Sequence, residues 1–253
     1  MKRNHWLIIL IIVCAMTVGN AQTLEKENQL LLVREDIVEP SNAADYETAL
    51  LNLTDFLRSN SIKDVNYVTT INDNFHYIHF SKIKDLNEIE GGMRAFINRK
   101  KDEAGFNLAW EDLAAAMNSY HYYVVKYLPE YSYVKDGNLW LEESPFRRWN
   151  MFYFKPGSEQ EVEKLLGAWK ALYENKGIES GYRVFMGVLG LDQPVVIMAN
   201  WAKSPLELQQ QIEHNVETLG DDGSALLLAM LDLANYIETV DGYYIPEFSY
   251  SPN

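Results

Sequence analysis

The chain has 253 residues, with 22 basic and 36 acidic side chains and one cysteine. A formal net charge of −14 argues against an extended basic surface, so neither nucleic acid nor anionic lipid is expected as a partner. A chain of this length can bury a sufficient core without disulfides, and the absence of low-complexity tracts predicts a compact, ordered protein.

Residues 1–21 form the pattern of a secretory signal peptide. Two basic residues precede an apolar run over 6–13, and small residues lead up to Ala21. The run is shorter than the roughly 20 residues that span a bilayer, which disfavours a membrane anchor. Cys14 leaves lipid attachment as a minor alternative. We therefore expect cleavage after Ala21 and a secreted or periplasmic chain without stable membrane insertion. The mature chain would contain 20 basic and 36 acidic residues.

The first part of the mature chain alternates strand-like and helical patterns. Apolar periodicity and turn residues predict a strand, a helix, a hairpin of two strands, a helix and an extended piece, in that order. These elements cover about residues 30–38, 46–57, 65–71, 75–81, 108–125 and 127–133.

The second part repeats this order. Ser158 and Glu161 predict a capping box at the start of a helix that Gly177 ends, and Ser204 is expected to cap a later helix that Gly220 ends. The other predicted elements are strands over 147–154, 182–188 and 195–201, a helix over about 225–240 and an extended piece over 244–250.

Two matching segments indicate an internal duplication. Residues 127–133 read Tyr-Leu-Pro-Glu-Tyr-Ser-Tyr, and residues 244–250 read Tyr-Ile-Pro-Glu-Phe-Ser-Tyr. A similar offset matches Ile62 with Ile178. The predicted fold class is therefore α+β, with two tandem ferredoxin-like βαββαβ repeats that form an intrachain pseudo-dimeric α/β barrel. The repeats are expected to cover residues 22–143 and 144–253.

The second repeat carries a family resemblance. Its residues are the Lys155-Pro156-Gly157 turn, the Gly181-Tyr182-Arg183-Val184 strand and the Trp201-Ala202-Lys203-Ser204-Pro205 segment. With them the chain resembles the dimeric α/β-barrel superfamily, and most of all its tandem-duplicated, NIPSNAP-like members. That superfamily includes haem enzymes, cofactor-free monooxygenases, lactone isomerases and members of unknown role. The resemblance thus implies the fold and leaves the chemistry open.

Strand alternation predicts which side chains face the space between the two sheets. We expect the more apolar face of the first strand, formed by Leu31, Val33 and Ile37, to contact the helices and the more polar set to line an inter-sheet cavity. The predicted cavity residues are Arg34, Asp36, Tyr77, His79, Arg148, Asn150, Phe152, Asn200 and Trp201. Buried polar groups need partners, so this set forms either a network that joins the repeats or a pocket for a small organic ligand. A register error of one residue would move all of them to the opposite face.

No cofactor and no metal site are expected. His76 and His79 are three residues apart on a strand and therefore point to opposite faces, which makes a poor chelating pair. The motifs that bind zinc, calcium, phosphate or dinucleotides are absent. The resemblance would allow His121 or His214 to reach a haem iron, but a solvated or capping histidine is favoured at both positions.

The leading interpretation is an exported, non-enzymatic protein with a small-molecule cavity between its two sheets. The alternative is a cofactor-independent monooxygenase or isomerase, in which His79 acts as acid or base and Arg34 or Arg148 stabilises an anionic intermediate. A haem-binding protein is a third interpretation. The ligand and the oligomeric state are left open.

Overall fold

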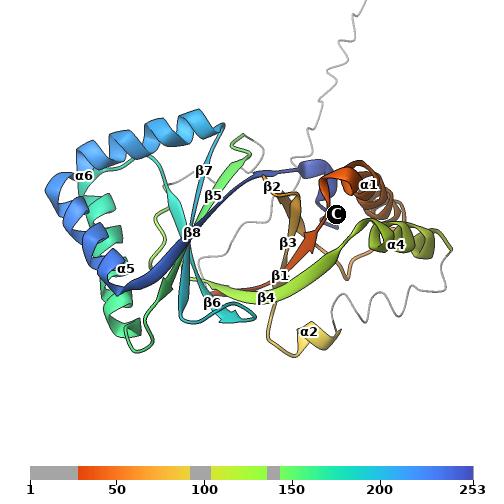
Figure 1. The fold of residues 1–253 in the computed structure, drawn as a ribbon, viewed down its shortest axis with the longest axis horizontal. Coiled ribbons are helices and arrows are strands. Elements are labelled where there is room, and N and C mark those ends of the chain that lie inside the picture. The colour runs from red at the N-terminus through yellow and green to blue at the C-terminus, as the bar shows by residue number, and fades with distance from the viewer. Residues whose placement is uncertain (1–27, 92–103, 136–142, 253) are drawn as a thin grey trace, which may run out of the picture.

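The computed structural model describes residues 28–91, 104–135 and 143–252, so the expected signal peptide lies outside the described residues. Their strands form one closed antiparallel barrel in the order β1-β3-β2-β8-β5-β7-β6-β4 (Figure 1). The strands are β1 (Gln29–Ile37), β2 (Val68–Asn72), β3 (His76–Ile83), β4 (Ser119–Tyr127), β5 (Phe146–Phe154), β6 (Tyr182–Leu189), β7 (Val195–Ala202) and β8 (Ala234–Tyr244). β1 to β4 are neighbours in the barrel, as are β5 to β8, and the β2–β8 and β4–β6 pairs close the ring.

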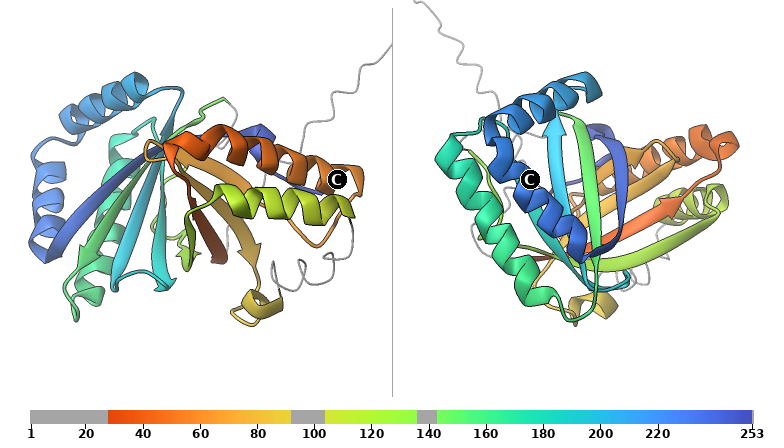
Figure 2. Two further views of the ribbon diagram at one scale, coloured as in Figure 1. Left: turned by 45° about the vertical axis from the view of Figure 1, so that its right-hand side comes forward. Right: turned by 60° about the vertical axis from the view of Figure 1, so that its left-hand side comes forward.

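Two pairs of helices cover opposite sides of the barrel (Figure 2). α1 packs on α4, and α5 packs on α6. The helical segments are α1 (Ala43–Ser59), α2 (Glu88–Gly91), α4 (Ala104–Ala116), α5 (Glu159–Lys176) and α6 (Pro205–Leu233), with short 3-10 turns η1 (Pro40–Asn42) and η2 (Pro246–Phe248). The α+β class and the closed barrel of the sequence analysis are therefore confirmed.

Apolar side chains fill three layers of the molecule. The stripe on α1 that includes Tyr46, Leu50 and Leu53 is buried in a cluster with α4, as its helical spacing predicts. On the other side, the buried Val162 and Leu166 of α5 pack with residues of α6 and the sheet. A third cluster lies inside the barrel, so both faces of the sheet carry apolar residues.

Two predicted helices end earlier than expected. The segment 108–125 is helical only to Ala116, because 119–127 form β4 between β1 and β6. Likewise, the predicted helix over 225–240 ends at Leu233, and the residues after it belong to β8. Both misassigned stretches are rich in tyrosine and in valine or isoleucine, which pack well on a pleated surface.

The helix ends follow the predicted signals in part. Gly177 adopts a left-handed conformation (φ 63°) and ends α5, and the Glu207 N–H donates to the Ser204 side chain at 3.2 Å at the start of α6. The predicted capping box at Ser158 does not form, because its hydroxyl donates to the Lys155 carbonyl at 2.6 Å. Gly220 does not end its helix: α6 continues through it with a kink (φ 60°, ψ −145°).

The two Tyr-x-Pro-Glu segments cross to the opposite half of the chain. The Tyr133 hydroxyl donates to the Ile178 carbonyl at 2.7 Å, and the Tyr250 hydroxyl donates to the Ile62 carbonyl at 2.6 Å. Ile62 and Ile178 are the residues that the sequence matches at a similar offset. Each half therefore depends on the other for part of its packing.

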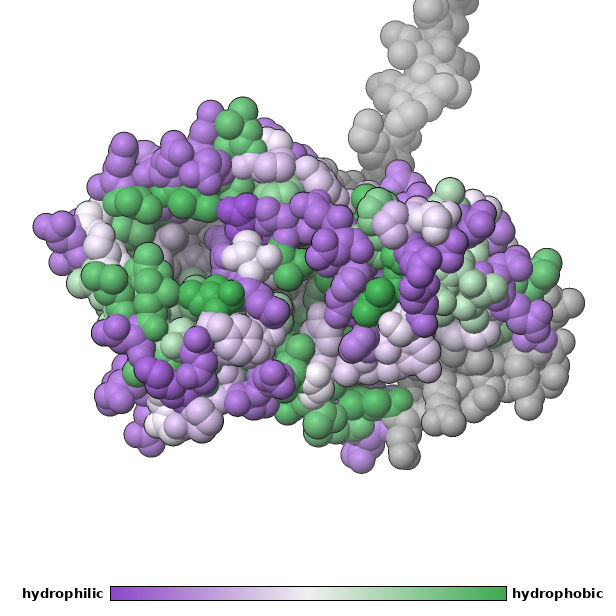
Figure 3. All heavy atoms as spheres, viewed as in Figure 1, coloured by the Kyte–Doolittle hydropathy of each residue, from purple (hydrophilic) through white to green (hydrophobic). Residues whose placement is uncertain are grey.

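The last turns of α6 present apolar side chains to solvent (Figure 3). Leu227, Leu228 and Leu231 are all exposed, Leu228 by 62%. Within the described ranges, however, no helix combines the length and apolarity that crossing a membrane requires.

Candidate functional site

The structure places eight of the nine predicted cavity residues on the outer face of the barrel. In β1, Leu31 and Glu35 line the interior, whereas Arg34 and Asp36 face α1 and α4. The prediction assigned the two faces of the strand the wrong way round, and such an error places every side chain of a strand on the opposite face. The apolar residues assigned to the helix side, Leu31 and Val33, instead form the cluster inside the barrel.

The other predicted residues follow the same correction. Tyr77 and His79 lie on the helix side, where they contact α1, and Phe152 packs in the cluster beneath α5. Arg148 forms an outer ion pair with Asp241 at 2.6 Å. Asn150 and Asn200 alternate with interior residues and so point outward. Trp201 alone of the nine lines the interior.

The helix-side residues form a paired cluster. Arg34 Nε donates to Asp36 Oδ1 at 2.6 Å, and the Tyr46 hydroxyl donates to Asp36 Oδ2 at 2.7 Å. His79 Nε2 lies 3.1 Å from that hydroxyl. Burial would raise the pKa of Asp36, but the hydrogen bond and charge of His79 and the charge of Arg34 outweigh it and hold the pKa below its usual range.

The cluster continues to the carboxy-terminal segment. The Thr69 hydroxyl donates to the Phe248 carbonyl at 2.6 Å, so its oxygen accepts from His79 Nδ1 at 2.8 Å. The remaining space measures about 40 Å³, enough for a few waters but not for an organic substrate. The cluster thus behaves as a structural network, and His79 is not placed to act on a substrate beside Arg34 or Arg148.

The barrel interior contains the large cavity. We call this space the lumen; its volume is about 540 Å³, within the range of small-molecule sites. Its middle is apolar, with walls formed by Leu31, Ile78, Phe80, Met151, Phe185 and Ile197.

One end of the lumen is cationic. Arg147 at the start of β5 pairs with Trp201 at the end of β7, and Arg183 at the start of β6 lies beside them. The Arg183 guanidinium lies 4.9 Å from the Trp201 ring centroid. Arg147 is 6% exposed and donates to the Ser144 and Phe146 carbonyls. By contrast, Arg183 Nε is buried and has no hydrogen-bond partner among the described residues.

Burial disfavours the charged form of both arginines, and the charge of Arg183 adds to this effect at Arg147. Burial, followed by the charge of Arg183, lowers the pKa of Arg147 to about 9, and burial also lowers the pKa of Arg183. Guanidinium groups stay protonated in proteins, so both side chains are cations. Two like charges in a poorly solvated space are unfavourable unless an anion lies between them.

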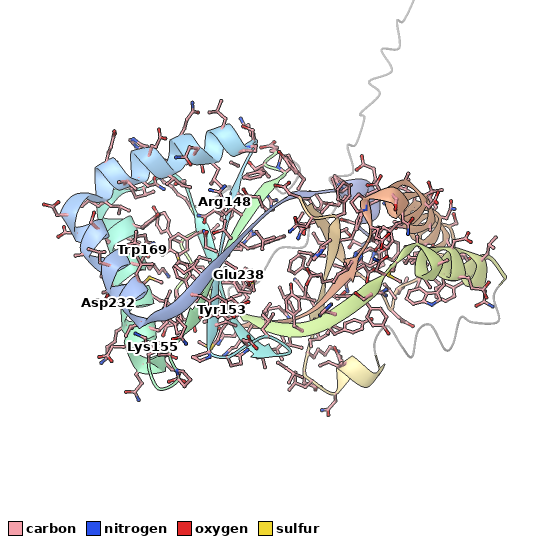
Figure 4. The ribbon with its side chains drawn as sticks, in the orientation of Figure 1. Arg148, Tyr153, Lys155, Trp169, Asp232 and Glu238 are labelled. Carbon is pink, nitrogen blue, oxygen red and sulfur yellow. The ribbon has the colours of Figure 1, made fainter. Side chains whose placement is uncertain are left out.

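The other end of the lumen is acidic and more open. Glu35 Oε1 lies 2.6 Å from His76 Nδ1, and the Tyr153 hydroxyl donates to Glu238 at 3.0 Å (Figure 4). Burial and the Glu238 hydrogen bond raise the pKa of Tyr153 well above its usual range, and burial followed by the charge of Glu35 does so for Tyr123. A carboxylate-oriented histidine of this kind can accept a ligand proton or hydrogen bond.

Sequence reasoning missed Arg147, Arg183 and the Glu35–His76 pair. The alternation of β6 could have placed Arg183. Tyr182 and Val184 are fully buried beneath the helices, so Arg183, which lies between them in the strand, points into the barrel. Among the described residues, no group of three or more His, Cys, Asp or Glu side chains is arranged to hold a metal.

Comparisons with known proteins bear on the fold. No protein-family model matches the sequence, and no curated protein matches it. An anthrone oxidase-like protein has a similar structure over 86% of this chain and 91% of its own, at 9% identity and a TM-score of 0.59. A putative monooxygenase from Lactobacillus acidophilus matches over 86% and 94% at 7% identity and a TM-score of 0.52.

A third structure, a mutant chlorite dismutase from Candidatus Nitrospira defluvii, matches over 86% of this chain and 92% of its own, at 10% identity and a TM-score of 0.52. Identities this low show a common fold and carry no activity with them. The chain accordingly shares the dimeric α/β-barrel fold of these proteins.

Proposed function

We propose that this is an exported, non-enzymatic protein that binds a small organic anion in the lumen of its barrel. The observation that carries the proposal is Arg183, which lines a cavity of about 540 Å³ and whose buried Nε has no partner among the described residues. A buried cationic donor is stable when a carboxylate accepts its hydrogen bonds, and such charge-assisted bonds are the strong ones.

The surroundings of Arg183 support an organic acid in particular. Trp201 provides a flat aromatic wall beside the guanidinium, and the apolar middle of the lumen suits a hydrocarbon body. The Thr70 hydroxyl also lines the lumen and has no partner among the described residues, although its side chain is buried. A bound ligand would satisfy it as well.

We also propose that the chain is a tandem-duplicated, NIPSNAP-like member of the superfamily. Its repeats, 22–143 and 144–253, would each be a ferredoxin-like βαββαβ unit. The support is the same strand order in both halves, β4-β1-β3-β2 and β8-β5-β7-β6, and the matched contacts of Tyr133 and Tyr250.

The binding proposal is tested by titrating the mature protein with decanoate and with phenylacetate while recording tryptophan fluorescence and the melting temperature. Arg183→Met should weaken binding at least about tenfold, because a charge-assisted bond to a partly desolvated anion is lost. The same substitution should raise the free energy of unfolding of the unliganded protein by about 1 kcal/mol, because it removes one of two neighbouring buried charges.

The matched control is Arg148→Met. Arg148 follows Arg147 in β5 but forms its ion pair with Asp241 on the outer face. We expect unchanged ligand affinity in this variant. Wild-type protein that binds neither acid, or Arg183→Met protein that binds as tightly as wild type, would contradict the proposal.

A further inference from the structure

We infer that the ligand of the lumen is a zwitterion, with a carboxylate held at the Arg147–Arg183 end and an ammonium group at the Glu35–Glu238 end. The inference rests on the proposed function and names its ligand class. Its basis is the separation of positive and negative side chains along the barrel.

The direction of the strands sets this separation. β5 and β6 begin at the same end of the barrel, and their first interior-facing residues are Arg147 and Arg183. β1 runs in the same sense, but its interior carboxylate, Glu35, lies near its last residue. Glu238 pairs with Met151, four residues beyond Arg147 on β5. Positive and negative interior side chains therefore occupy opposite ends.

The spacing defines the length of the ligand. Four residues of strand correspond to about 13 Å along β5. A chain of about ten carbons covers that distance, and the apolar walls between the two ends match it. The ligand class is thus an elongated ω-amino acid or a compound of the same charge spacing.

The two ends differ in their access to solvent. Arg147 is 6% exposed, whereas the Glu35 side chain is 22% exposed, that of His76 is 27% exposed and Glu238 is exposed. A ligand therefore enters past the acidic end. Glu238 accepts one hydrogen bond from Tyr153, and a carboxylate has further acceptor positions for an ammonium. The same carboxylates repel a ligand whose second end is negative.

The test compares three probes that share one chain length: decanoate, its ω-amino analogue aminodecanoate, and decanedioate. At low salt, aminodecanoate should bind tightest and decanedioate weakest, with about a tenfold difference in Kd between these two. Raising the salt should narrow the difference, because the acidic end is partly solvated.

Glu238→Gln and the Glu35→Gln Glu238→Gln double variant should reduce the difference in Kd between aminodecanoate and decanedioate to below about threefold, because the charges that distinguish these two probes are removed. Both substitutions keep the side-chain size, and the exposed position of Glu238 makes the single variant safe for folding. Asp241→Asn on the same strand but on the outer face is the control, and it should retain the full difference.

The outcomes separate the two proposals. If decanoate binds through Arg183 but all three probes bind equally, or the order survives in the double variant, the zwitterion inference is overturned and the binding function stands. If no probe binds, the binding function itself fails and the inference with it.

Discussion

Asp36 is the residue on which the helix-side network of the first half depends. It accepts from Arg34 and from the Tyr46 hydroxyl, and His79 lies 3.5 Å away. The carboxylate is 1% exposed, so its charge is compensated by protein groups and not by water. Its removal would leave the buried Arg34 guanidinium without a counter-charge and the buried Tyr46 hydroxyl without its acceptor.

We expect Asp36→Asn to lower the free energy of unfolding by about 3 kcal/mol at neutral pH, measured by urea denaturation. Because folding lowers the pKa of Asp36, the carboxylate stabilises the native state at every pH above the ordinary aspartate pKa of about 3.8. That stabilisation is lost as the pH falls through the lower folded-state pKa. The difference in unfolding free energy between wild type and Asp36→Asn should therefore shrink in strong acid.

The exposed Asp55, which pairs with Arg58, supplies the control: Asp55→Asn should change the free energy of unfolding by less than about 0.5 kcal/mol. A loss at Asp36 as small as that at Asp55 would show that the network is not stabilising.

At the level of elements, the two closing segments make the same hydrogen bond to opposite halves. The Val184 N–H donates to Ser132 Oγ at 2.8 Å, and the Thr69 N–H donates to Ser249 Oγ at 2.9 Å. Each serine thus satisfies a backbone donor at the start of a strand of the other half.

Ser132→Ala and Ser249→Ala should each lower the free energy of unfolding by about 1 kcal/mol or more, because each leaves a backbone N–H unsatisfied. Chemical denaturation of both variants checks this. Ser224→Ala, on the exposed side of α6, should have almost no effect. A large loss in one variant and none in the other would contradict the equivalence of the two halves.

At the scale of the whole molecule, the barrel is complete without the first residues of the chain. β1 begins at Gln29, and every described helix and strand follows it. Removal of residues 1–21 therefore takes away none of the elements that close the barrel.

We propose that residues 1–21 are removed on export, so that the mature protein begins at Gln22, as an intact-mass measurement of the secreted or periplasmic fraction would show. Protein produced directly as residues 22–253 should then have the same melting temperature as the exported form. An exported chain that retains residues 1–21, or that carries a lipid at Cys14, would contradict this prediction.

The sequence by itself determined the pattern of the fold. Periodicity in α1 and α5, the stop at Gly177 and the cap at Ser204 are local signals, because they depend on neighbours in the chain. The sequence predicts helix for residues 119–125 of β4 and 234–240 of β8, because their strand character becomes decisive only when partner strands supply hydrogen bonds on both sides.

Only the tertiary structure decided which face of each strand is inside. Alternation separates two faces but does not show which one is inside, and here both carry apolar clusters: the outer face beneath the helices and the inner face around the lumen. Apolar residues therefore occur on both, and the polar Arg34 and Asp36 were assigned inward although they pair beneath α1 and α4. The charged ends of the lumen exist only after closure, because Arg147, Arg183, Glu35 and Glu238 come from four strands that the chain brings together around one cavity.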